Sequence, residues 1–351
     1  MAKTGAPASL TPQYWGQLAH QEAMDMLFWS RFIGTGPNNI IQRIDDLEGK
    51  HGNQITYPLR MKLTGSGVDG DARLRGNEEA LVYYNDTVSI ARKRFGVITE
   101  GEWAEKQTMI DLRKDAKESL TIQYKEWMDT EITMKVSGIA AYTFSNTPVA
   151  PSSTRVIYGG AATSSAGGGD LAAATCVFTT MEIDRAIYTA KTASPKIRPI
   201  TIPDGAFKGR EFYGVLAHPR QIYDLKVDSN STWYAANRDA NVRGWDNPIF
   251  SGAIGIWNGA IVYEYEGCYQ ADDAGTGSNV AWARALLLGA QAGVVAFGSP
   301  LKSLEDDDDY HNQQGFALSQ IVGIDKTIFN SVDFGVIAID TAAAAPTGVA
   351  H

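Results

Sequence analysis

Apolar residues that recur at steps of three and four predict one long amphipathic helix, from Trp103 to about Val136. Its apolar face consists of Met109, Leu112, Ala116, Leu120, Tyr124, Trp127 and Met128. The opposite face is charged, with Lys114–Glu118 and Lys125–Asp129 spaced as ion pairs, and Gly138 ends the helix. At ~1.5 Å per residue the helix is roughly 50 Å long, which favours a strut over a helix of a compact enzyme domain.

A long β-hairpin is predicted ahead of this helix, because two runs rich in β-forming residues flank a polar connection. The runs are Ile55–Leu63 (ITYPLRMKL) and Leu81–Phe95 (LVYYNDTVSIARKRF). The connection TGSGVDGDARLRGNEEA is glycine-rich and carries both signs of charge, so it cannot form a hydrophobic core of its own. We expect a protruding arm that lies on a partner, and a mobile surface loop is the alternative.

The N-terminal segment is predicted to be a flexible arm over residues 1–10 that leads into a helix. Thr11 and Pro12 are typical of a helix start, and apolar residues follow at helical spacing as far as Gly34. The helix carries large rings, among them Trp15, that must be buried either on their own subunit or on a neighbour. Because so few residues precede the helix, we expect no scaffolding segment within this chain.

Beyond the strut, a loop-like stretch over 145–174 leads into a region of mixed helices and strands. Thr179 and Glu182 form a capping box for its first helix. Glu211–His218 is predicted to be a buried strand, and Pro219 begins a second helix. The pattern therefore predicts a mixed α/β body after the long helix.

The C-terminal third is rich in β-forming residues. GAIVYEYEG and ARALLLGAQAGVVAFG are candidates for strands or buried helices. The closing stretch GFALSQIVGIDKTIFNSVDFGVIAIDTA predicts two or three strands, with turns at 323–325 and 331–333. Together with the long helix and the hairpin, these elements indicate an α+β fold.

Length and composition fit a globular protein with more than one folding unit. The chain has 351 residues, of which 44% are hydrophobic and 20% charged. Its net charge of −9 disfavours a protein that grips nucleic acid by its phosphates, since such proteins are usually basic. The acidity is compatible with the wall of a DNA container, and equally with simple solubility.

Cysteines and apolar stretches indicate a protein made in the cytoplasm, with no membrane partner. The two cysteines, Cys176 and Cys268, do not lie in a C-x-x-C pattern, so neither a zinc site nor a disulfide framework is expected. The N-terminus lacks an apolar signal core. The longest apolar stretch, 283–297, is interrupted by Arg284 and Gln291 and is too short to span a bilayer.

Motifs for catalysis, cofactors or metals are weak. Gly65-x-Gly67-x-x-Gly70 has the glycine spacing of a dinucleotide site but no helix pattern follows it, so hairpin turns explain it better. The five histidines are scattered, and no nucleophile motif is present. Glu305–Asp309 (EDDDD) does not have the spacing of a calcium loop. We expect an acidic surface loop that faces Arg or Lys of another subunit, through Asp306, Asp307, Asp308 and Asp309.

The order of these elements resembles the Hong Kong 97 capsid fold of tailed bacteriophages. The amino-acid sequence is also similar to the major capsid family typified by the lytic coliphage N-four, roughly over residues 12–341. The stretches that carry the resemblance are QRIDDLEGKHGNQITYPLRMKLTGSGVDGDARLRGNEEAL, RKDAKESLTIQYKEWMDTEI, GREFYGVLAHPRQIYDLK and GFALSQIVGIDKTIFNSVDFGVIAIDTA.

This resemblance implies a shell subunit and a division of the chain. The implied parts are an N-terminal arm (1–50), an E-loop hairpin (51–100), a P-domain spine helix (101–139), an A-domain (about 140–300) and closing P-domain strands with a tail (301–351). The chain would assemble with itself as pentamers and hexamers in the host cytoplasm and enclose double-stranded DNA in the virion. A separate scaffolding protein, a portal and decoration proteins are the further partners implied. A Lys–Asn cross-link, as in the founding member, is not expected, because nothing marks Lys62 as reactive.

Two other functions remain as alternatives at this point. An encapsulin-type nanocompartment shell shares the fold but stores an enzyme cargo. An enzyme on a mixed α/β body is the other, and the lack of a catalytic constellation disfavours it. The long charged hairpin and the likeness to the N-four family favour the phage shell over the nanocompartment.

Reversal of charge at the hairpin tip should impair assembly and leave the subunit folded. The charged residues of the tip are Asp69, Asp71, Arg73, Arg75, Glu78 and Glu79. Exposed ion pairs contribute only ~0.2–1 kcal/mol each, but a shell repeats the contribution in every copy. We expect Arg73→Glu with Arg75→Glu to lower shell formation in light scattering, more strongly at high salt, with an unchanged circular dichroism spectrum. A wild-type yield of shells would instead support the mobile-loop alternative.

Overall fold

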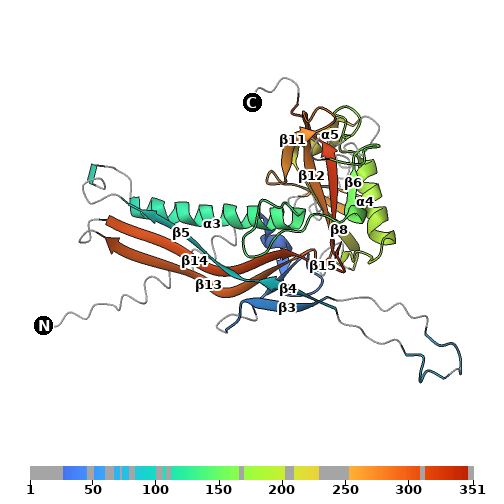
Figure 1. Ribbon diagram of the computed structural model, residues 1–351, viewed down its shortest axis with the longest axis horizontal. Coiled ribbons are helices and arrows are strands. Elements are labelled where there is room, and N and C mark those ends of the chain that lie inside the picture. Colours follow the sequence, from blue (N-terminus) through green and yellow to red (C-terminus); the bar gives the residue numbers. More distant parts are fainter. Residues whose placement is uncertain are drawn as a thin grey trace.

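The computed structural model describes residues 27–45, 51–59, 67–71, 73–78, 84–99, 106–107, 112–165, 170–201, 209–228, 253–308 and 313–346. They form two bodies (Figure 1). One is an elongated arm, in which a long helix lies on a five-stranded sheet. The other is a lobe around an eight-stranded sheet. A hairpin leaves the junction of the two bodies on the side opposite to the arm.

The long helix α3 (Leu112–Ser137) confirms the predicted strut over these residues, and the predicted start at Trp103 lies outside the described residues. Its 26 residues span roughly 39 Å at the rise of an α-helix. Both predicted ion pairs form, at 3.8 Å for Lys114–Glu118 and 3.9 Å for Lys125–Asp129. The N-terminal half is amphipathic as expected, whereas every residue from Glu131 to Gly138 is buried. The helix is therefore a surface strut at one end and a core element at the other.

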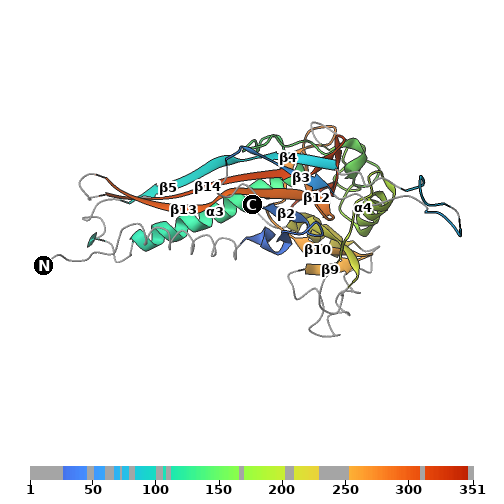
Figure 2. The ribbon, with the colours of Figure 1, turned by 90° about the horizontal axis from the view of Figure 1, so that it is seen from below.

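The sheet of the arm has the order β1-β2-β13-β14-β5. The strands are β1 (Ile33–Gly34), β2 (Ile41–Ile44), β13 (Gly293–Asp308), β14 (Gln313–Lys326) and β5 (Ala91–Ile98). Alternate residues of β14, such as Phe316 and Leu318, share a buried cluster with Leu120 and Tyr124 of α3. Figure 2 shows the long ribbons β13, β14 and β5 running beside α3. One face of this sheet is thereby covered by α3 as far as Phe316.

The predicted second hairpin strand, 81–95, is two strands rather than one. β3 (Gln54–Leu59) pairs with β4 (Tyr84–Ser89) in a separate two-stranded sheet, and β5 pairs with β14. The chain changes sheets at Ile90, whose backbone N–H donates to the carbonyl of Asn53. The two halves face different cores, since Val88 packs at the hairpin root and Phe95 packs under α3. A continuous run of β-forming residues cannot show such a change of partner.

The lobe is built on the eight-stranded sheet, whose main path is β6-β17-β12-β8-β10-β9. Its strands are β6 (Val156–Tyr158), β17 (Val336–Ala342), β12 (Val280–Leu288), β8 (Glu211–Ala217), β10 (Ala260–Glu264) and β9 (Ala253–Trp257), with β7 (Ile200–Thr201) beside β8 and β11 (Gln270–Ala274) beside β12. Helices α4 (Thr180–Thr192) and α5 (Pro219–Val227) share a buried cluster with the central strands. The predicted capping box at Thr179 and Glu182 is confirmed.

The closing segment departs from the prediction in its turns. β14 continues through 323–325, where a turn was expected. Gly323 is there for close approach, since a Cβ atom would lie 2.3 Å from the carbonyl oxygen of Ser89. The second turn falls at Asn330 and Ser331, both with positive φ, between β15 (Ile328–Phe329) and β16 (Val332–Asp333).

The two bodies meet at the C-terminal end of α3. The guanidinium of Arg284, on β12, donates two hydrogen bonds to Asp340 on β17, at 2.7 and 2.8 Å. It donates a third, of 2.9 Å, to the carbonyl oxygen of Ser137, the last residue of α3. A cation at this end satisfies an unpaired helix carbonyl and complements the negative end of the helix dipole.

The end of α3 should depend on Gly138 for steric as well as conformational reasons. Gly138 has φ +71°, and a Cβ atom would lie 2.4 Å from the carbonyl oxygen of Val149. Gly259 is a matched control, with φ +81° and open space around its Cβ position. Positive φ alone costs roughly 1–2 kcal/mol in a non-glycine residue, and overpacking adds about 1–3 kcal/mol. In urea unfolding of unassembled subunits we expect Gly138→Ala to destabilise clearly more than Gly259→Ala, and equal losses would contradict the steric argument.

Candidate assembly surfaces

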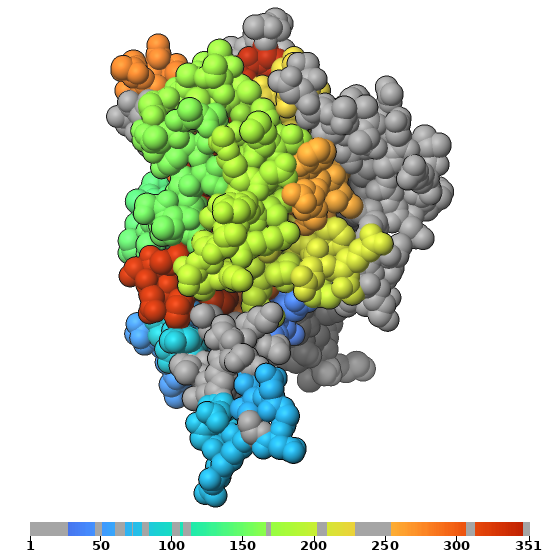
Figure 3. All heavy atoms as spheres, turned by 90° about the vertical axis from the view of Figure 1, so that its right-hand side faces the viewer, coloured from blue at the N-terminus to red at the C-terminus, as the bar shows by residue number. Residues whose placement is uncertain are grey.

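The hairpin tip is exposed over its described residues, 67–71 and 73–78, except at Val68, which is half-buried. Figure 3 shows it as a narrow projection from the body. Local bonds shape it, since the Asn77 side chain donates to the carbonyl of Arg73 at 2.9 Å and the Gly76 N–H donates to Glu78 at 2.6 Å. Within the described residues, Asp69, Asp71, Arg73 and Arg75 form no ion pair. Two other predicted interface residues, Glu79 and Trp15, lie outside the described residues.

The acidic run is part of strand β13, so the expected loop was wrong. Asp306, Asp307 and Asp308 pair in register with Gly315, Gln314 and Gln313 of β14. The uncharged partners allow the ladder to continue to the end of the arm. Glu305 pairs at 2.8 Å with Lys117 of α3 in the same subunit, which ties this end to the helix.

Asp306 is exposed at the far end of the arm. The side chains of Asp307 and Asp308 and all of Asp309 lie outside the described residues. Across the part of the chain that is described, no group of three or more acidic, His or Cys side chains is placed to hold a metal ion. No described helix is long and apolar enough to cross a membrane.

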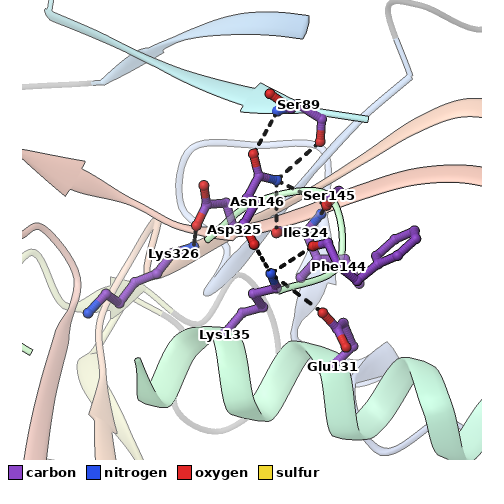
Figure 4. Close-up of polar contacts among 9 residues, drawn as sticks. All are labelled: Ser89, Glu131, Lys135, Phe144, Ser145, Asn146, Ile324, Asp325 and Lys326. Carbon is purple, nitrogen blue, oxygen red and sulfur yellow. Dashed lines mark hydrogen bonds and ion pairs between the residues drawn. The ribbon is translucent and has the colours of Figure 1, made fainter. Parts of the chain in front are cut away.

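Asn146 joins the root of the hairpin to the sheet of the arm (Figure 4). Its side-chain oxygen accepts from the N–H of Ser89 at 3.0 Å. Its amide nitrogen donates to the carbonyls of Ser89 and Ile324, each at 3.1 Å. One side chain thus satisfies the backbone of β4 and β14 together, as a strand between them would.

A buried lysine of α3 positions the segment that carries Asn146. The ammonium of Lys135 donates to the carbonyls of Phe144, at 2.7 Å, and of Asn146. It also lies 3.5 Å from the carboxylate of Glu131, one helical turn earlier. Burial lowers the pKa of Lys135 and raises the pKa of Glu131, so each depends on the other's charge. Lys135 of α3 therefore fixes the direction of the hairpin root through the segment that carries Asn146.

Acidic side chains complete the root on its other side. The hydroxyl of Tyr57 on β3 donates to Asp86 of β4 at 3.1 Å, and Asp86 also accepts from the N–H of Ile328 at 3.0 Å. Asp325 of β14 accepts from the N–H of Lys326 at 2.8 Å. Burial, and secondarily the charge of Asp86, raises the pKa of Asp325 to about 6.

The segment before β1 is anchored on α3 as well. The short 3-10 helix η1 (Phe28–Phe32) presents the N–H groups of Phe28 and Trp29 to Asp129, at 3.2 and 3.4 Å. The indole N–H of Trp29 donates to Thr133 at 2.9 Å, and the ring is fully buried in its own subunit. The helical pattern placed Asp129 on the solvent face, but it is buried because this segment covers it.

A family model described as phage capsid protein matches residues 10–345. The chain belongs to this family of phage capsid proteins. It is 29% identical, over 94% of its length and 93% of the relative, to the major capsid protein of Pseudomonas phage KPP25. Among solved structures it is similar to the capsid of Ralstonia phage GP4, with 32% identity, a TM-score of 0.80 and coverage of 92% of each chain.

A second solved capsid, that of cyanophage Pam1, aligns at 26% identity and a TM-score of 0.72, over 99% of this chain and 100% of that one. The predicted α+β fold of the Hong Kong 97 type is confirmed, and the protein is a structural capsid subunit of a tailed phage. The comparisons favour this function over the nanocompartment alternative. The narrower resemblance to the coliphage N-four family stays a prediction.

The raised pKa of Asp325 predicts a pH dependence of subunit stability. A carboxyl whose pKa is higher in the folded state binds more protons there than in the unfolded state. The free energy of unfolding therefore falls as the pH rises from about 4 to about 6. Asp325→Asn keeps a hydrogen-bond acceptor and removes the half-buried charge. We expect it to stabilise the unassembled subunit at pH 7.5 by on the order of 1 kcal/mol, with a smaller gain at pH 5.

Asp115→Asn, on the exposed side of α3, is the matched control. Urea unfolding of the three proteins at several pH values provides the measurement. A gain for Asp325→Asn that does not change with pH would contradict titration of this group.

Proposed function

We propose that this capsid protein assembles as pentamers and hexamers in which each subunit overlaps the next. The observation that carries the proposal is the pair of projections on opposite sides of the junction (Figure 1). The hairpin tip is exposed on one side, and the arm extends on the other. Such a subunit favours head-to-tail contacts, which close into rings when the rotation between neighbours is suitable.

Within this proposal, the two bodies take the roles that the family resemblance implies. The five-stranded sheet with α3 is the P-domain, the eight-stranded lobe is the A-domain near the symmetry axes, and the hairpin beyond β3 and β4 is the E-loop. The chain crosses between the bodies after α3, before β13 and again before β17. The domains are thus interleaved rather than consecutive, and the junction at Arg284 couples them.

The remaining partners follow from chemistry and from the resemblance. A net charge of −9 suits a wall that encloses DNA without base recognition. We infer a purely structural role without catalysis or cofactor, assembly in the host cytoplasm, a separate scaffolding protein and a portal, and decoration proteins as further candidates.

The test is the assembly state of the full chain. After expression in bacteria, we expect shells in negative-stain images and large particles in gradient sedimentation, because a lone subunit leaves its projections uncovered. Size-exclusion chromatography over a wide concentration range should show capsomers or shells. A sharp monomer peak throughout, with no particles in any fraction, would contradict the proposal.

A further inference from the structure

We propose that the buried guanidinium of Arg155 binds a small inorganic anion, for which chloride is the simplest candidate. The site lies where the short 3-10 helix η2 (Ser153–Arg155) meets strand β16 and the segment that follows α4. The inference goes beyond the proposed function, because it concerns a ligand held inside a single subunit. It is carried by a buried cation whose hydrogen-bond donors and charge are not matched by the residues around it.

The side chain of Arg155 is closed off from solvent, with an exposed fraction of 0%. Its Nη2 donates to the carbonyl oxygen of Pro195, in the segment after α4. Its Nε and Nη1 are buried as well, and among the described residues neither has a hydrogen-bond partner. A buried donor without an acceptor loses its hydration and gains no bond in exchange, so in native proteins such a group generally has a bound water or ion as its partner.

The carboxylate of Asp333, on β16, acts on Arg155 but is bonded to other donors. The ammonium of Lys326 lies 2.5 Å from Asp333 Oδ1. The backbone N–H of Ser152 donates to Asp333 Oδ2 at 2.9 Å. Burial lowers the pKa of Arg155, and the charge of Asp333 offsets this effect only in part. Asp333 is therefore the counter-ion of Lys326, and Arg155 shares its field without a bond to it.

The buried charges at this place leave one positive charge in excess. Arg155 and Lys326 are cations, Asp333 is the single anion bonded to either of them, and all three side chains are buried. Asp325 also acts on Lys326, but it acts on Lys135 as well and has no bond to Arg155 within the described part of the chain. A buried charge without a bonded partner of opposite sign is strongly unfavourable.

An anion meets both needs of Arg155, whereas a water molecule meets only one. Water can accept a hydrogen bond from Nε or Nη1, but it leaves the charge without compensation in a medium of low polarity. An anion accepts the bond and supplies the opposite charge, and a guanidinium offers it several N–H groups in a fixed orientation. Because Arg155 is enclosed and the excess is a single charge, the anion that fits is small and monovalent.

Chloride-dependent unfolding of the full chain tests the inference. Chloride replaces gluconate at constant ionic strength, and unassembled subunits are unfolded in urea. A ligand that binds only the folded state lowers the unfolding constant by the factor 1 + [L]/Kd. We expect at least about a fivefold decrease for the wild type between zero and about 0.3 M chloride, which corresponds to a Kd of roughly 75 mM or tighter.

Two arginine variants assign the effect to the site. Arg155→Met keeps an unbranched apolar side chain and removes the charge, so the unfolding constant should no longer depend on chloride. Arg94→Met, on the exposed side of β5, removes the same charge from the surface and is the matched control. It should keep the full chloride dependence of the wild type.

A second readout needs no variant and decides the question if Arg155→Met does not fold. Bromide has the charge of chloride and can be located by its anomalous scattering. In crystals of the wild-type subunit grown with bromide, we expect an anomalous peak in hydrogen-bond contact with the guanidinium of Arg155.

Equal chloride dependence in the wild type and Arg155→Met would assign the effect to other sites and overturn the inference. A wild type that does not respond to chloride, or crystals without bromide at Arg155, would also overturn it, and water molecules would then be the partners of Nε and Nη1. Neither result bears on whether the chain forms shells, so the proposed function is tested separately.

Discussion

The structure depends on the buried end of α3, where one helix terminus supports both bodies. Arg284 neutralises that terminus, bonds to Ser137 and holds Asp340, so it connects the helix of the arm to two strands of the lobe. Truncation of one partner of a buried, bonded ion pair leaves an unpaired charge, which is far costlier than loss of a surface pair. The junction therefore fixes the end of the helix to the lobe.

The same half of α3 also sets the direction of the projections. Asp129 binds the segment before β1, and Lys135 holds the loop whose Asn146 clamps the hairpin root. The contacts of Asp129 and Asn146 join residues that are distant in sequence, whereas Lys135 contacts the loop directly after the helix. The hairpin root and the segment before β1 are thus held by polar groups as well as by apolar packing. Directional bonds suit a subunit that must repeat one geometry in every copy of a shell.

The arm differs from a globular domain in having one buried face and one face that is only partly covered. Its helix side is a continuous core from Ala116 to Val136. Its outer side is closed by β3 and β4 near the junction and open beyond. A monomer in water would be expected to carry only polar residues on such a face, yet Ile98 and Leu304 are exposed there among charged residues. This mixture is typical of a surface that is buried in an assembly.

The sequence by itself determined the elements whose signals are local. The strut helix, its ion pairs, the capping box at Thr179 and the end at Gly138 follow from spacing and from backbone preferences, which need no knowledge of the partner. The order of elements, together with the similarity of several stretches of the sequence, also indicated the capsid fold, which the family match confirms.

Only the tertiary structure decided which sheet each strand joins and which polar residues are buried. A β-forming run has the same pattern whichever strand it pairs with, so the break at Ile90 and the continuous β14 were not predictable. Asp129 lies on the face that the helical pattern leaves to solvent, and Arg284 only interrupts an apolar run. Their burial depends on partners that folding brings from distant positions, and the spacing of residues along the chain carries no information about them.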